Sequence, residues 1–382
     1  MDARPAADQV QFGGRRPPIR SAGRRRTAVA VGIAALLALA SYGLAARHHG
    51  KPQPAPVSFI NTGHRLLGVT GSWKLYAQGA DAVVRIQLAR GQVTVTRFPQ
   101  LRSSGPVSSV VGRDWALVRP LDHVPGYLIS ASEPARVLSG PLGPGGMLLL
   151  PGPGPGQLWS GAAVADAGPM LVRRLDGTPT GTTGPRLEGS WPVPSGTGSY
   201  LLLEPNGISI PQPGGTGLTT LRLSSVLAIG PGSLLVTQCR RFQCAAVLFD
   251  ERTGQRRALP SLNYDAVQLT GVIAPDGRLA AFSQWTHDQV ALELLNLTTG
   301  TERKVLAPLG QAGLDEQSLV WSPDSRWLFA ALNSGRIVAI NAASGRVTGL
   351  GIRLPPVSQL AIWPGSTGSG GVTPQPSDPQ PR

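Results

Sequence analysis

The chain has 382 residues, among them 49 Gly and 36 Pro, and only 15% of its residues are charged. This composition favours short strands joined by many turns, and it excludes a protein built mainly of long helices. The formal net charge is +14, but no run of basic and aromatic residues suitable for stacking on bases is present, so we expect no nucleic-acid partner.

The N-terminal region predicts a membrane anchor. Residues 1–26 are rich in Arg, Pro and Gly without apolar periodicity, which predicts a disordered basic tail. Residues 27–46 are twenty residues without a charge, long enough as a helix to cross a bilayer core of about 30 Å. Arg24, Arg25 and Arg26 stand directly before this segment, and the positive-inside rule then places the N-terminus in the cytoplasm and the rest of the chain outside.

A cleavable signal peptide is the alternative interpretation of the same segment. Small residues around Gly43 to Ala45 would suit a signal peptidase. The 26 residues before the apolar stretch are long for a signal peptide, so an uncleaved anchor is favoured. No Cys follows the apolar run, which excludes a lipoprotein anchor. Residues 47–57 are predicted to form a linker, stiff where Pro recurs, and residues 364–382 a disordered tail.

The first half of the remaining chain contains four irregular groups of predicted strands. The first group is 65–98, with strands at 72–77, 83–88 and 93–97 around a turn at Gly91. The next groups cover 107–138, 142–188 and 190–223. The eight Trp residues fall mostly in such strands, as with Trp73, Trp115, Trp321 and Trp327, and core packing explains them better than a ligand-stacking site.

The two cysteines, Cys239 and Cys244, are separated by four residues. A metal site would need more ligands, and a redox motif would usually have two intervening residues. A disulfide that closes a hairpin fits an oxidising compartment best. Two reduced, partly buried thiols remain the alternative.

The second half contains a repeated turn of the pattern Asp/Asn-x-x-Ser/Thr-Gly. Its copies begin at Asp250, Asn296 and Asn341 and end at Gly254, Gly300 and Gly345, with the glycines 46 and 45 residues apart. An apolar strand precedes each copy and a more polar strand follows it. The Asp or Asn side chain can accept backbone N–H bonds and Gly supplies a positive φ, so these residues are expected to shape hairpins and to need no ligand.

A second turn, built on Pro-Asp, precedes two of these copies. Asp276 and Gly277 lie in the first of these turns, and Asp324 lies in the second. Because each turn links two strands, a unit of about 45 residues contains four antiparallel strands, as in a blade of a β-propeller.

The segments Val272 to Ala280 and Leu319 to Leu328 resemble the TolB-type, WD-repeat-like propeller blades of bacterial envelope proteins. The clear resemblance covers about 224–363, and the earlier part is more degenerate. It implies an all-β propeller over 58–363, for which we count seven four-stranded blades, with six or eight possible. Residues 357–363 repeat the start of a blade and are expected to pair into the first blade and close the ring, which removes an open sheet edge.

No catalytic constellation stands out in the sequence. It contains no Gly-x-Ser-x-Gly, no His-Glu-x-x-His and no phosphate-binding Gly-rich loop, and His64, His123 and His287 are isolated. We therefore expect no cofactor and no enzyme activity, and predict a binding module for an extracytoplasmic protein or cell-wall ligand. The alternatives are a glycan-active hydrolase or lyase with its site in the central channel, and a signal sensor whose cytoplasmic tail relays a message.

Overall fold

The computed structural model describes the chain from residue 57 to residue 363, with gaps. The described residues are 57–98, 107–112, 115–120, 126–130, 136–138, 147–162, 168–186, 191–195, 200–204, 207–211, 218–221, 225–240, 243–259, 271–286, 289–309, 314 and 317–363. The predicted tail 1–26, transmembrane helix 27–46, linker residues 47–56 and C-terminal tail 364–382 lie outside them. The part of the chain described contains no helix long and apolar enough to cross a membrane.

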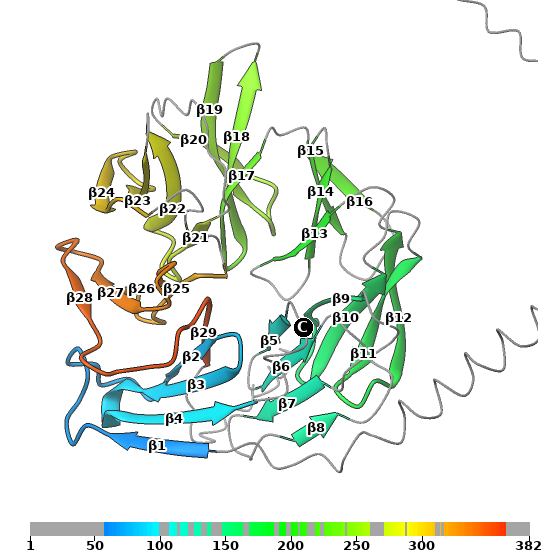
Figure 1. The fold of residues 1–382 in the computed structure, drawn as a ribbon. Helices are drawn as coiled ribbons and strands as arrows, with labels where there is room; N and C mark the ends of the chain where they lie inside the picture. The colour runs from blue at the N-terminus through cyan, green and yellow to red at the C-terminus, as the bar shows by residue number, and fades with distance from the viewer. Residues whose placement is uncertain are drawn as a thin grey trace, which may run out of the picture. The chain divides into compact units, whose positions relative to one another are not determined.

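The first sheet brings the two ends of the described chain together (Figure 1). It has five antiparallel strands in the order β1 (Val57–Asn61), β4 (Gln92–Arg97), β3 (Ala82–Gln87), β2 (Lys74–Gln78) and β29 (Gln359–Trp363). The short 3-10 helix η1 (Leu88–Arg90) links β3 to β4. The last strand pairs with β2 from Lys74↔Trp363 to Gln78↔Gln359, which confirms that residues 357–363 close the ring through the first unit.

Three four-stranded antiparallel sheets follow in chain order. The second sheet contains β5 (Val107–Val111), β6 (Trp115–Pro120), β7 (Gly126–Ser130) and β8 (Arg136–Leu138). The third contains β9 (Met147–Pro151), β10 (Gln157–Ala162), β11 (Pro169–Arg174) and β12 (Pro179–Arg186). The fourth contains β13 (Trp191–Pro194), β14 (Tyr200–Glu204), β15 (Gly207–Pro211) and β16 (Leu218–Leu221).

The fifth sheet has eight strands, formed by two antiparallel sets of four. One set is β17 (Ser225–Gly230), β18 (Ser233–Arg240), β19 (Gln243–Asp250) and β20 (Arg256–Ala258), and the other is β21 (Gly271–Ile273), β22 (Leu279–Thr286), β23 (Gln289–Asn296) and β24 (Glu302–Leu306). The sets join where β17 pairs with β21 in parallel, at Ala228↔Gly271 and Ile229↔Val272. The sixth sheet contains β25 (Leu319–Trp321), β26 (Trp327–Ala331), β27 (Ile337–Asn341) and β28 (Val347–Gly349).

The apolar core of the described residues lies between neighbouring strand sets. Seven clusters of buried side chains each join one set to the next in chain order, and the cycle closes between β25–β28 and the first sheet. In β2, for example, Leu75 and Ala77 pack toward β25–β28, whereas Tyr76 packs toward β5–β8. Each sheet is apolar on both faces because successive side chains of a strand point to opposite faces and each face meets a neighbour.

Two details differ from the expected row of separate four-stranded sheets. The first sheet gains β1 as a fifth, outermost strand, so Val57 begins a strand and is not the last residue of a linker. The change from Pro-rich chain to a β-branched and aromatic segment explains where β1 starts. In addition, two of the expected units share the eight-stranded sheet, so the described strands form six sheets.

Candidate functional site

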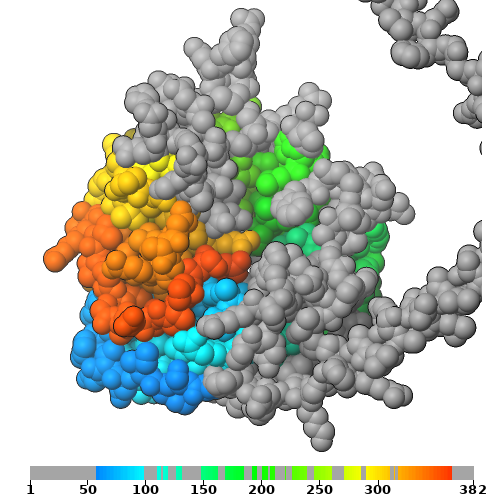
Figure 2. Space-filling view, viewed as in Figure 1, coloured from blue at the N-terminus to red at the C-terminus, as the bar shows by residue number. Residues whose placement is uncertain are grey.

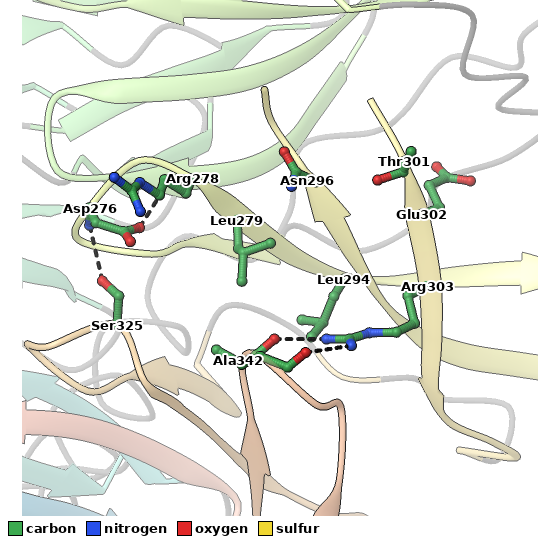
Figure 3. Close-up of a pocket in the computed structure, with 11 residues that line it drawn as sticks. Asp276, Arg278, Leu279, Leu294, Asn296, Thr301, Glu302, Arg303, Ser325 and Ala342 are labelled. Carbon is green, nitrogen blue, oxygen red and sulfur yellow. Dashed lines mark hydrogen bonds between the residues drawn. The ribbon is translucent and has the colours of Figure 1, made fainter. Parts of the chain in front are cut away.

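A surface groove lies between the set β21–β24 and the set β25–β28 (Figure 3). It encloses about 470 Å³. Its lining comes from the turns and strand ends of both sets: Asp276, Arg278, Leu279, Leu294, Asn296, Thr301, Glu302, Arg303, Ser325, Ala342 and Ala343. The close-up shows these side chains on facing elements, with those of β21–β24 on one side and Ser325 and Ala342 on the other.

The groove combines an apolar floor with a charged rim. Leu294 is buried and Leu279 is half-buried, and both pack against the core cluster shared by the two strand sets. Asp276, Arg278 and Glu302 are exposed at the rim. The groove can therefore bury an apolar group of a ligand while polar groups meet charges of both signs around it.

The turn between β21 and β22 places Asp276 at this rim. The Gly277 N–H donates to the Ala274 carbonyl at 2.9 Å, and the Asp276 carboxylate accepts the Arg278 N–H at 3.0 Å. Gly277 adopts a φ of +70°. Pro-Asp-Gly thus folds locally into a tight turn.

The corresponding turn between β25 and β26 has Ser325 where the other has Gly277. Ser325 has a φ of +57°, one of two positive values among the described residues other than Gly. It is buried, and its Oγ accepts the Asp276 N–H of the neighbouring set at 3.0 Å. Sequence reasoning did not identify this role of Ser325, which no local pattern signals.

Further bonds fasten the two strand sets along the groove. The Arg303 guanidinium donates to the carbonyls of Ala342 and Ala343, at 2.7 and 2.9 Å. The Trp321 indole Nε1–H donates to the Val272 carbonyl at 3.1 Å. Arg303 and Ser325 therefore support the groove as well as line it.

The repeated Asp/Asn turns have the same geometry in all three copies. The side-chain oxygens of Asp250, Asn296 and Asn341 accept backbone N–H bonds two or three residues ahead, at 2.7 to 3.0 Å. The closing glycines, Gly254, Gly300 and Gly345, have φ of +71°, +73° and +71°. Backbone bonds, led by the one from Thr253, hold the pKa of Asp250 below its usual value.

The structure brings only some of these turn residues to the groove. Asp276 and Asn296 line it, and Gly345 lies against Arg303 at its edge. Asp250 and Gly254 belong to β17–β20, outside the groove. Asp324 stays within its own turn, where its carboxylate accepts the Ser322 hydroxyl and the Arg326 N–H.

A turn of related chemistry that sequence reasoning missed joins β11 to β12. The Asp176 carboxylate accepts the Thr178 N–H at 2.8 Å, which lowers the pKa of Asp176, and Gly177 has a φ of +89°. The adjacent residues Asp176 and Gly177 are the sequence signal from which this turn could have been predicted.

Cys239 and Cys244 lie directly opposite each other in the β18–β19 hairpin. The Glu251 N–H donates to the Gly232 carbonyl at 3.0 Å, which makes 232/251 a hydrogen-bonded pair. Alternation along the ladder then makes the cysteines a non-hydrogen-bonded pair, with Cα atoms about 4.5 Å apart. That separation lies within the range of disulfides.

Of the three isolated histidines in the sequence, only His64 lies among the described residues. His64 is exposed in the loop after β1, with Nδ1 2.8 Å from the Thr62 carbonyl oxygen, and His123 and His287 lie outside the described residues. Among described residues, no group of three His, Cys, Asp or Glu could hold a metal ion. Glu293 is buried, and burial is the main cause that raises its pKa.

The tryptophans behave as core residues where they are described. Trp73, Trp115 and Trp321 are buried, and Trp327 is half-buried against the core, as the sequence predicted.

Comparison with known proteins identifies the fold and no family. The sequence matches no family model, and it matches no curated protein. A solved structure of a puromycin-hydrolyzing peptidase from Mycobacterium tuberculosis is similar to this chain with a TM-score of 0.50 and 13% identity, over 80% of this chain and 57% of that one. The fold is a β-propeller.

Two other solved structures are also similar to this chain. AztD from Citrobacter koseri is similar with a TM-score of 0.47 and 14% identity, over 81% of this chain and 89% of that one. A protein assigned as TolB from Agrobacterium tumefaciens is similar with a TM-score of 0.33 and 12% identity, over 62% of this chain and 76% of that one.

Proposed function

We propose that this propeller is a membrane-anchored, extracytoplasmic binding module that holds a protein or cell-envelope ligand in the groove between β21–β24 and β25–β28. The groove itself carries the proposal, because it offers an apolar floor within a charged rim on a firmly fastened support. Ligand sites commonly combine apolar walls with a few fixed polar groups.

The same residues favour binding over catalysis. The Asp276 carboxylate accepts a bond from its own turn, the Asn296 side chain accepts two, and Arg303 donates to carbonyls across the groove. These bonds hold the turns and the two strand sets in a fixed arrangement, which a binding surface requires. We therefore propose a binding role without enzyme activity. We also propose no nucleic-acid partner, because the sequence contains no run of basic and aromatic residues suited to stacking on bases.

Residues 27–46 are proposed as the single transmembrane helix, with residues 1–26 in the cytoplasm. The uncharged length of this segment and the three arginines directly before it support this topology. The propeller then lies outside the membrane, where a Cys239–Cys244 disulfide would persist.

We further propose that the ring has seven blades, counting the eight-stranded sheet as two. Each of its halves is a complete antiparallel set of four strands, and the parallel contact between them spans only two residue pairs. The seven core clusters, each between successive sets, support the same count.

A bulky side chain in the groove tests the binding proposal. Ala343 is exposed on the groove wall, and Ala343→Trp would fill it without entering the core. Arg252 is the equivalent turn position of an earlier repeat, is also exposed, and lies outside the groove, so Arg252→Trp is the matched control. Full-length proteins would be crosslinked in membranes, and the captured partners compared by quantitative mass spectrometry.

We expect the Ala343→Trp protein to lose partners that both the wild type and the Arg252→Trp protein retain. Equal capture by all three proteins would contradict the groove as the binding site. If the same partners return after deletion of the propeller, the binding-module proposal itself fails.

A further inference from the structure

The outermost strand of the first sheet exposes apolar side chains. In β1, Val57 is 44% exposed, Phe59 78% and Ile60 36%, the large apolar residues that stand out as exposed among those described. The strand pairs with β4 on one side, and its other edge has no partner among the described strands (Figure 1). Figure 2 shows the first described residues, in blue, at the lower left edge of the view. An open, apolar strand edge indicates a surface that something covers.

Basic residues lie near the C-terminal end of this strand. The Thr62 N–H donates to the Gly91 carbonyl at 3.0 Å and the Leu66 N–H to the Leu88 carbonyl at 2.9 Å, so the loop after β1 lies against η1. This arrangement gathers His64, Arg65 and Arg90, all exposed, near the end of β1. Segments 57–70 and 88–98 contain no Asp or Glu. Apolar side chains with Arg beside them are suited to an anionic lipid surface, where the former enter the headgroup boundary and the latter meet phosphates.

The short length of chain before β1 also favours a lipid surface as the partner of this strand. Ten residues, 47–56, separate the end of the uncharged segment 27–46 from the first residue of β1. Even fully extended they reach at most about 35 Å, so a bilayer that contains this segment stays within that distance of β1. A short tether of this kind gives the strand a high effective concentration at the lipid surface.

We propose that β1 and the basic loop beside it form a lipid-contacting surface that rests the propeller on the anionic outer face of the membrane. This inference rests on the proposed anchoring by residues 27–46. A second copy pairing through β1, or the chain's own residues 1–56 covering it, are the competing occupants.

Site-specific photocrosslinking of the full-length protein tests the proposal. Benzoylphenylalanine would replace Phe59, an exposed aromatic position, and in a control protein would replace Arg257, which is exposed on the outer strand β20 of another set. Both proteins would be reconstituted in vesicles of phosphatidylcholine with phosphatidylglycerol and in vesicles of phosphatidylcholine alone. Flotation measures anchoring, and mass spectrometry identifies the adducts.

We expect several-fold more lipid adduct at position 59 than at position 257. This excess of lipid adduct at position 59 should fall in vesicles without phosphatidylglycerol. It should also fall in a protein that carries both Arg65→Gln and Arg90→Gln. Adducts with a second copy or with residues 1–56, no lipid adduct at 59, or equal labelling at 257 would overturn the lipid surface while flotation persists. A protein that fails to float would overturn the anchoring and this inference together.

Discussion

The closing glycines of the repeated turns have nearly the same conformation but different neighbours. A Cβ added to Gly254 would meet no atom within 4 Å, whereas a Cβ added to Gly345 would lie 3.0 Å from the Cζ of Arg303. Both have a φ of +71°. The turn alone therefore determines the need for Gly at 254, while the neighbouring strand set adds a second reason at 345.

This contrast gives a prediction on stability. Gly254→Ala should lower the free energy of unfolding by about 1 kcal/mol, the cost of a left-handed conformation with a Cβ. Gly345→Ala should cost more, because it also displaces the Arg303 guanidinium from the carbonyls of Ala342 and Ala343. Denaturant unfolding measures both changes. In an Arg303→Ala background the two substitutions should cost the same, and a persisting difference would show that the guanidinium is not the cause.

Glu293 predicts a dependence of stability on pH. Burial, and secondarily Glu302, raises its pKa above the ordinary 4.5, while Lys304 opposes the rise. With the folded-state pKa above that of the unfolded chain, stability falls as pH increases from about 4.5 through the folded-state pKa, because the unfolded chain ionises first. Glu293→Gln removes the ionisable group and with it this loss of stability at higher pH. The variant should be more stable than the wild type at pH 7, and the gain should shrink below pH about 4.

Thermal unfolding across this pH range measures the effect, with Glu204→Gln, a half-buried position on β14 of another strand set, as the control. A gain for Glu293→Gln that is the same at all pH values would show that packing and not ionisation is responsible.

At the scale of elements, Ser325 links a turn to the neighbouring strand set. Ser325→Ala keeps the positive φ but loses the bond from the Asp276 N–H. Ser325→Gly loses the same bond but relieves about 1 kcal/mol of backbone strain. We expect the glycine variant to be more stable than the alanine variant by about that amount. If the alanine variant equals the wild type in denaturant unfolding, the Oγ bond contributes nothing.

The β18–β19 hairpin predicts an oxidised cysteine pair. With Cys239 and Cys244 opposite each other, thiol titration of the unfolded protein should find no free thiol without reductant and two after reduction. Closing a loop this short should stabilise the fold by about 2 kcal/mol. The reduced wild type and the Cys239→Ser, Cys244→Ser double variant should then unfold alike. Free thiols before reduction would support the alternative of reduced cysteines.

For the whole molecule, β29 is the element that joins the end of the chain to its beginning. Trp363 is fully buried and stacks on Tyr76, with ring centroids 5.0 Å apart. Truncation after Pro356 removes β29 and should strongly destabilise the propeller, because it exposes the inner edge of the first sheet and opens the ring. Trp363→Ala alone should cost about 3–5 kcal/mol.

Truncation after Trp363 is the control, since it removes only residues 364–382 and keeps every strand from β1 to β29. It should leave the unfolding transition unchanged. If truncation after Pro356 also leaves the transition unchanged, closure through the first sheet does not stabilise the propeller.

The sequence determined by itself the features whose physics is local. An Asp or Asn side chain bonds to N–H groups two or three residues ahead and Gly accepts a positive φ, so the repeated turns were readable around Asp250, Asn296 and Asn341. Their even spacing predicted the four-stranded units, and the likeness of residues 357–363 to the start of a blade predicted their return to the first sheet. The tertiary structure alone decided what depends on contacts between units: the fifth strand β1, the sharing of one sheet by two sets, the groove, and the roles of Ser325 and Arg303. These features arise from bonds between residues about 40 to 50 positions apart or between strands of different sets, for which a local pattern carries no signal.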